Sequence, residues 1–353
     1  MKPGGNAAPI LLYSASPWLP GPHLQTLWSS LAAPRPRPAY RRERWTTPDG
    51  DFIDLDHLAF ESEGSAPLWV IFHGLEGDSS SHYARAMMDQ AHALGWHGVV
   101  VHFRGCSGSL NLAPRAYHSG DSAEIDWVMR RLHAQHPTRA MVACGVSLGG
   151  NALLKWLGEQ GEAAGWVTAA AAICPPQDLQ AGAESLSRGF NLVYTAHFLR
   201  TLRRKSLMML ALHPGLIDEA RVRAARTFFD FDDAVTAPLH GFSSCFDYWT
   251  RSSCRQFLPG IRVPALVINA LNDPFVPVRA LAQSSEVSRF VELDYPAEGG
   301  HVGFPAHRLP GRFEWIPQRV SQFLTQHLPR PDRHASARRQ GSALATGNHG
   351  ASA

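Results

Sequence analysis

Short, continuous apolar runs along this chain alternate with segments in which apolar residues recur every three or four positions. Runs of the first kind predict buried strands, and segments of the second kind predict amphipathic helices. The apolar runs are 68–72, 98–103, 141–144 and 167–174, and the periodic segments are 82–94 and 122–133. Two further strands are predicted at 42–45 and 52–57, around the turn 48–50. Apolar strands separated by helices are typical of a mostly parallel sheet that helices cover on both faces, so the pattern predicts an α/β fold.

The alternation stops after about residue 175. From there to residue 262 the pattern predicts helices at 191–212 and 217–228 but no buried strand, whereas strands return at 264–270 and 289–293 and a closing helix at 315–327. We therefore expect an irregular N-terminal segment (1–40), a core in two parts (41–175 and 263–328), a helical insertion (176–262) and a disordered tail (329–353). Inserted helices at the carboxyl ends of strands usually form a lid or a substrate pocket, although a structural extension of the core would give the same pattern.

The composition describes a globular chain and excludes several classes of partner. Hydrophobic residues make up 44% and charged residues 18% of the 353 residues. The net charge of +3 is small for this length, so we expect no nucleic-acid partner. No apolar run reaches the roughly 18 residues of a membrane span. The short stretch 7–13 contains a proline and is not expected to be a signal peptide.

The cysteines and histidines show no metal-ligand spacing. Five cysteines occur without a C-x-x-C pair, and the histidines are scattered. We therefore expect free thiols in a reduced, cytoplasmic setting, with no metal and no cofactor. The pattern predicts no particular oligomeric state.

The most informative motif is Gly145-Val146-Ser147-Leu148-Gly149-Gly150. It lies between the strand-like run 141–144 and the helix-like segment 151–157. This order is the context of a nucleophile elbow, in which glycines permit a turn too sharp for side chains and a strained serine exposes its hydroxyl. Ser147 is therefore the candidate nucleophile, and an ordinary Gly/Ser turn is the alternative.

A serine nucleophile needs a histidine to accept its proton and a carboxylate to orient that histidine. After a nucleophile elbow these partners follow in the chain order acid, then histidine, beyond late strands. Asp273, just past the run 264–270, is the candidate acid. The weaker candidates for this role are Asp294, Asp232 and Asp233.

The candidate base is His301. It follows the last predicted strand, and the glycines before and after it allow a loop to carry the ring over the sheet edge. His307, further along the same loop, is the alternative.

Two backbone amides should stabilise the oxyanion that forms when the serine attacks a carbonyl. One is expected from Leu148, the residue after the nucleophile, and the other from Leu75 in the loop His73-Gly74-Leu75-Glu76-Gly77. For His73 a structural role is preferred to a catalytic one. Cys106 is a weak alternative nucleophile, because no base or oxyanion site can be identified for it.

Several separated segments, taken together with the serine motif, resemble the YheT-like group of the α/β-hydrolases. They are Pro22-His23-Leu24-Gln25-Thr26-Leu27, Phe103-Arg104-Gly105-Cys106-Ser107-Gly108, Tyr117-His118-Ser119-Gly120 and Asp273-Pro274-Phe275-Val276-Pro277. The resemblance spans about residues 20–328. It implies an α/β-hydrolase fold with Ser147, Asp273 and His301 as the catalytic triad, and it implies a reaction more firmly than a substrate.

These observations predict a serine hydrolase that cleaves small-molecule carboxylic esters, with acyl chains of short to medium length or acylglycerol-like lipids. Aromatic residues of the insertion, such as Phe198 and Phe228, suggest an acyl pocket, and ordinary packing of helices is the alternative. Three other functions stay open: acyl transfer to an alcohol, lipid hydrolysis at a membrane surface, and binding without catalysis. The basic run Arg200, Arg203, Arg204 and Lys205 beside apolar residues is compatible with peripheral membrane contact through the insertion, but a solvated helix face is the preferred interpretation.

Overall fold

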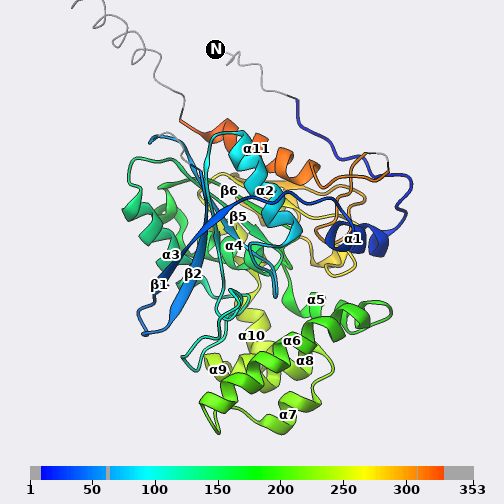
Figure 1. Cartoon of the computed structure of the whole chain (residues 1–353). Helices are drawn as coiled ribbons and strands as arrows, with labels where there is room; N and C mark the ends of the chain where they lie inside the picture. Colours follow the sequence, from blue (N-terminus) through cyan, green and yellow to red (C-terminus); the bar gives the residue numbers. More distant parts are fainter. Residues whose placement is uncertain (1–8, 61–63, 308, 330–353) are drawn as a thin grey trace, which may run out of the picture.

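The computed structural model describes residues 9–60, 64–307 and 309–329. Its centre is an eight-stranded sheet in the order β1-β2-β4-β3-β5-β6-β7-β8 (Figure 1). The strands are β1 (Tyr40–Thr46), β2 (Phe52–Leu58), β3 (Leu68–Phe72), β4 (His97–Val101), β5 (Met141–Val146), β6 (Val167–Ile173), β7 (Ala265–Ile268) and β8 (Val291–Asp294). Strand β2 pairs antiparallel with β1 and β4, and all other neighbours are parallel. The predicted mostly parallel sheet is confirmed.

Helices cover both faces of this sheet because the strands are apolar on both faces. In β3, Leu68, Val70 and Phe72 pack in one core cluster, whereas Trp69 and Ile71 pack in the other. The first cluster contains residues of α3 (Ser122–Gln135) and α4 (Leu148–Gln160), and the second contains residues of α2 (His82–Ala93) and α11 (Trp315–His327). None of the helices in the described ranges is long and apolar enough to cross a membrane.

The chain between β6 and β7, called the inserted segment here (residues 174–264), folds as a group of helices at the lower end of the molecule in Figure 1. Its α-helices are α5 (Leu179–Leu186), α6 (Asn191–Leu212), α7 (Glu219–Ala224), α8 (Phe228–Phe231), α9 (Ala237–His240) and α10 (Cys245–Ser252). Several of them share a small apolar core of their own, which includes Leu199, Val222 and Val235. The segment leaves the sheet at the carboxyl end of β6, on the edge where loops of parallel strands meet.

Two predictions of local structure are wrong. The expected helix 217–228 is interrupted at Ala225, whose ψ of 128° is not helical, and a new helix begins where Thr227 and Asp230 form a capping box. The segment 1–40 is not irregular throughout, because it contains α1 (Pro22–Leu31) with proline at its first position. The predicted tail 329–353 lies outside the described residues apart from Pro329.

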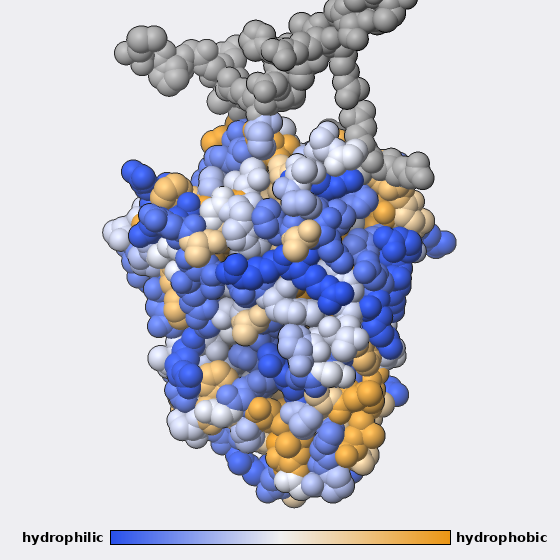
Figure 2. Space-filling view, turned by 90° about the vertical axis from the view of Figure 1, so that its left-hand side faces the viewer, coloured by the Kyte–Doolittle hydropathy of each residue, from blue (hydrophilic) through white to orange (hydrophobic). Residues whose placement is uncertain are grey.

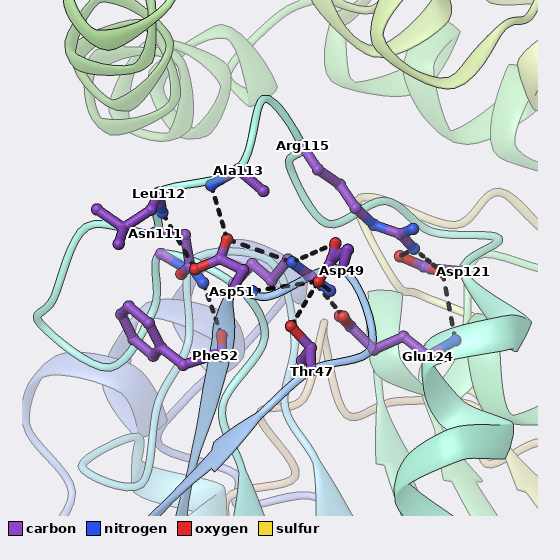
Figure 3. A network of polar contacts seen from close by, with 12 residues as sticks. Thr47, Asp49, Asp51, Phe52, Asn111, Leu112, Ala113, Arg115, Asp121 and Glu124 are labelled. Carbon is purple, nitrogen blue, oxygen red and sulfur yellow. Dashed lines mark hydrogen bonds and ion pairs between the residues drawn. The ribbon is translucent and has the colours of Figure 1, made fainter.

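A buried network around Arg104 holds the long loop between β4 and α3 (Figure 3). The Arg104 guanidinium donates to Glu124 at 2.6 Å and to Asp51 at 3.3 Å. Asp51 in turn accepts hydrogen bonds from the backbone N–H groups of Leu112 and Ala113, at 3.1 and 3.0 Å. The network therefore fixes the loop that continues to Tyr117 and the wall of the cavity described below.

Replacing Arg104 by Met should destabilise the fold strongly. The change would leave the carboxylates of Asp51 and Glu124 buried without their cation, which typically costs about 3–5 kcal/mol. The matched control is Arg223→Met, because Arg223 forms an exposed pair with Glu219 on α7 and such pairs are worth at most about 1 kcal/mol. Urea unfolding followed by circular dichroism measures both, and equal losses would show that the network does not hold the loop.

Candidate active site

Ser147 lies in a sharp turn between β5 and α4. Its φ of 50° and ψ of −117° are strained for a residue with a side chain. The neighbouring glycines explain how the turn can form, because a Cβ atom on Gly149 would lie 2.5 Å from the carbonyl oxygens of Phe72 and His73. A Cβ atom on Gly145 would likewise overlap the backbone of Gly149. The G-x-S-x-G pattern thus marks a turn that only these glycines permit.

Three side chains predicted from the sequence form one chain of hydrogen bonds. The Nδ1 atom of His301 lies 2.8 Å from Oδ2 of Asp273, and Nε2 lies 3.0 Å from Oγ of Ser147. Because an ionised carboxylate can only accept, Nδ1 carries a proton, and Nε2 is free to accept the proton of Ser147. Asp273 is held in turn by the backbone N–H groups of Phe275 and Val276, which donate to Oδ1 at 2.8 and 3.2 Å.

Helix α1 supports the loop that carries His301, and the sequence analysis did not identify this role. The backbone N–H of His301 donates to Oγ1 of Thr26 at 2.9 Å, and Oε1 of Gln25 accepts from the N–H of Gly299 at 3.0 Å. Gly300 has a φ of +64° and packs so closely on α1 that a Cβ atom would lie 2.6 Å from Oγ1 of Thr26. The sequence motif that contains Gln25 and Thr26 indicated that this segment is important. Its spacing alone did not indicate which residues it contacts.

The alternative acids and bases lie elsewhere. Asp294 pairs with Arg319, and Asp233 pairs with Arg221. His307 is largely exposed and lies 3.4 Å from Glu314. Asp232 lines the cavity but bonds to Thr236 and Trp249 instead of a histidine.

The loop after β3 lies directly beside the nucleophile, since a Cβ atom on Gly74 would lie 3.3 Å from Cβ of Ser147. Its other amides are engaged: Gly74 N–H donates to Tyr83 Oη at 2.9 Å, and Gly77 N–H donates to Gly74 O at 2.9 Å. Glu76 N–H donates to the hydroxyl of Tyr117 at 2.8 Å. By contrast, the N–H groups of Leu75 and Leu148 donate to no hydrogen bond within the described part of the chain. Both residues line the same cavity as Ser147.

His73 shapes this loop through both ring nitrogens. Nε2 accepts from the N–H of Phe103 at 3.0 Å, so Nδ1 carries the proton and donates to the carbonyl of Gly74 at 2.7 Å. Complete burial lowers the pKa of His73 to about 3, which keeps the ring neutral. The geometry agrees with a structural role.

Two cysteines lie near the site. Cys174 Sγ, Asp273 and His301 offer ligand atoms within 4.8 Å of one another. However, the Nδ1–Oδ2 distance of 2.8 Å is that of a direct hydrogen bond, shorter than the roughly 3.3 Å between ligands of a tetrahedral ion with bonds of about 2.0 Å. Burial raises the pKa of the Cys106 thiol to about 12, so this group is a poor nucleophile at neutral pH.

A cavity of about 670 Å³ contains Ser147 and His301 in its wall. Much of the remaining wall is apolar and comes from the inserted segment, including Tyr194, Phe198 and Phe228. Other large apolar residues of the inserted segment lie elsewhere: Phe190 and Phe229 are exposed, and Leu199 packs in the small core of the inserted segment. The cavity has the size and composition of a site for a small organic ligand.

Comparisons with known proteins agree with this arrangement. Residues 67–305 match the family model described as alpha/beta hydrolase fold. The chain is 35% identical over 309 residues to Putative esterase YheT of Escherichia coli (strain K12), which covers 87% of this chain and 91% of the relative. It is 30% identical over 310 residues to Phospholipase ABHD3 of Mus musculus, covering 85% of this chain and 75% of the relative.

A solved structure supports the same fold. The Pyrococcus furiosus esterase Pf2001 superposes with a TM-score of 0.55 at 17% sequence identity, and the match covers 83% of this chain and 94% of that protein. At this identity the likeness concerns the fold alone.

The family model and the identity to the Escherichia coli relative show that the chain belongs to the α/β-hydrolase family and, within it, to the YheT-like group.

Proposed function

We propose that this carboxylic ester hydrolase works through an acyl-enzyme formed on Ser147, with His301 as the base and Asp273 as the acid. The observation that carries the proposal is the continuous chain of hydrogen bonds from Asp273 through His301 to Ser147, at 2.8 and 3.0 Å. It ends at a hydroxyl that the elbow places in the wall of a largely apolar cavity.

In the first half-reaction, Oγ of Ser147 attacks the ester carbonyl while Nε2 of His301 takes its proton. The imidazolium is stabilised by Asp273 and then protonates the leaving alcohol. In the second half-reaction the neutral His301 takes a proton from water, which attacks the acyl group. The imidazolium then returns this proton to Oγ of Ser147 as the bond to the acyl group breaks, which releases the acid and free Ser147. Asp273 orients the ring of His301 so that Nε2 faces the reacting groups in both half-reactions.

The N–H groups of Leu75 and Leu148 are the proposed donors to the oxyanion. Both lack a partner inside the described protein and both lie at the cavity beside Ser147. A donor that is already fixed and unpaired needs no rearrangement when negative charge develops on the carbonyl oxygen. Losing one such donor typically costs about 10²–10³ in rate.

The proposed substrates are esters of apolar acyl chains, of short to medium length or in acylglycerol-like lipids. The apolar wall of the cavity supports this class, and so does the name of the mouse relative, a phospholipase. Acyl transfer would use the same groups with an alcohol in place of water, so product analysis in the presence of added alcohols separates the two reactions.

Replacing Ser147 by Ala should abolish hydrolysis, by a factor on the order of 10⁶. Asp273→Asn should cost less, on the order of 10⁴, because it misorients His301 but keeps the nucleophile. Initial rates on p-nitrophenyl esters from acetate to palmitate, measured for wild type and both variants, test this and give the preferred chain length. Activity that survives in Ser147→Ala would refute the proposed mechanism.

A second candidate function is hydrolysis at a membrane surface. Apolar side chains gather at the lower end of the molecule, which is the inserted segment (Figure 2). On α6, Leu192, Val193, Met208 and Leu212 are exposed, as are Arg200 and Arg204. The basic face is smaller than the sequence suggested, because Arg203 binds backbone carbonyls and Lys205 pairs with Glu76. We propose that this face of α6 lies on anionic lipid.

Flotation with vesicles containing phosphatidylserine tests the membrane contact. The double variant Arg200→Gln/Arg204→Gln should bind less than wild type, since each basic residue near an anionic surface is worth about 1 kcal/mol. Arg130→Gln is the control, because Arg130 lies on α3 in an ion pair with Asp126. If the wild type and the double variant bind the vesicles equally, the proposed membrane contact through α6 is contradicted.

Asp232 gives the cavity wall a pH-dependent group. It begins a π-helical turn (Asp232–Thr236) and accepts hydrogen bonds from Thr236 Oγ1 at 2.6 Å and Trp249 Nε1 at 2.8 Å. No cation pairs with it within the described ranges, and burial raises its pKa to about 6. Its contribution to stability is therefore complete below the unfolded pKa near 4 and is lost as the pH rises through about 6.

The variant Asp232→Asn should remove this pH dependence. Between pH 5 and pH 8, the unfolding free energy of the variant should rise by about 1–2 kcal/mol relative to that of the wild type. Urea unfolding at the two pH values measures it. A difference that stays constant, or moves towards the wild type, would contradict the burial argument.

A further inference from the structure

The turn that carries Leu75 has a strained residue at its far end. The N–H of Gly77 bonds to the carbonyl of Gly74 and closes a β-turn around Leu75 and Glu76. In this turn Glu76 has a φ of 55°, a left-handed conformation that glycine usually fills. A glutamate keeps such a conformation only where its surroundings hold it.

Two side chains hold Glu76. Its N–H donates to Oη of Tyr117 at 2.8 Å, and Tyr117 donates back to Oε1 of Glu76 at 2.9 Å. Tyr117 is itself fixed, because its buried ring stacks on Phe103 with centroids 5.4 Å apart and an angle of 6° between the planes. The second partner is Lys205, whose Nζ lies 2.8 Å from the same Oε1.

Lys205 is the one cation that pairs with Glu76 among the ion pairs of the described residues. It comes from α6, 129 positions further along the chain. The side chains of Glu76 and Lys205 are 10% and 32% exposed, so water only partly screens the pair. Tyr117 offers a hydrogen bond but no charge, so removing the ammonium group would leave the largely buried Glu76 carboxylate without a counter-ion.

We propose that Lys205 is a positioning residue for ester hydrolysis, which holds the Glu76 carboxylate and thereby keeps the β-turn closed with the Leu75 N–H beside Ser147. This inference rests on the proposed function, in which Leu75 donates to the oxyanion. The Gly74 end of the turn is held within the core by His73 and Tyr83. Its Glu76 end is held by Tyr117 and, from the inserted segment, by Lys205, so the inserted segment contributes to the oxyanion site without touching the substrate carbonyl.

Lys205→Met is the test variant. Its kcat should fall about tenfold with KM within twofold of wild type, less than the 10²–10³ expected for complete loss of an oxyanion donor. Lys205→Arg keeps the charge and should recover most of the rate. The control is Lys155→Met, because Lys155 is also a lysine paired with a glutamate, but it lies on α4 and its partner Glu159 is not part of the turn that contains Leu75. A purely structural role would lower the melting temperature of Lys205→Met but leave kcat as in the control.

A double-mutant cycle shows whether the effect passes through Glu76. In a Glu76→Gln background the charge pair is already gone, so Lys205→Met should change kcat by less than twofold. An undiminished tenfold effect in that background would overturn the proposal, as would a single variant with the kcat of the control.

A crystal structure of Lys205→Met separates this inference from the proposed function. A Glu76 φ that leaves the left-handed region, with a displaced Leu75 amide, supports the positioning role, and an unchanged turn overturns it. If the wild type shows no hydrolysis that depends on Ser147, the proposed function fails, and this structure alone decides the positioning role.

Discussion

The site depends on one close approach of backbone, between the turn after β5 and the end of β3. These strands are parallel neighbours in register from Leu68–Met141 to Phe72–Gly145, so they reach the same edge of the sheet together. Because Gly149 has no side chain, the start of α4 can pack against the carbonyls of Phe72 and His73. The same contact turns Ser147 out of the sheet and places Gly74 against it. One steric constraint therefore sets both the turn at Ser147 and the position of the loop that contains Leu75.

Asp273 and His301 reach this edge by a second property of the sheet. They lie in the loops that follow β7 and β8, and parallel strands all carry such loops at their carboxyl ends. The loop of His301 is rich in glycine, and α1 helps to fix it through hydrogen bonds from Gln25 and Thr26. A histidine held in this way loses little conformational freedom when it meets the serine, which favours proton transfer.

The sequence predicted what is local or follows from the order of elements. The alternation of apolar runs indicated the sheet, and the G-x-S-x-G motif and the chain order placed Ser147, Asp273 and His301, which the structure brings within hydrogen-bond distance. Other features could not be predicted. The break at Ala225 depends on a capping box that competes with helix propensity, and α1 is a single short helix between proline-rich stretches. The pair Glu76–Lys205 joins residues 129 positions apart, and no periodicity or spacing marks such a contact.

The core and the inserted segment contribute different parts of the site, and this has a consequence for substrate specificity. The core carries Ser147, Asp273 and His301, the proposed triad, whereas the inserted segment supplies much of the apolar wall and has a small core of its own. Its α10 end is tied to the core beside the sheet, since Asn151 on α4 bonds to the backbone of Ser252 and Cys254, and Tyr248 accepts from the N–H of Ser119. Substitutions in the wall can therefore change which ester fits while the triad keeps its geometry. Lys205 differs from these residues, because it is not part of the wall itself but joins the inserted segment to the turn that contains Leu75.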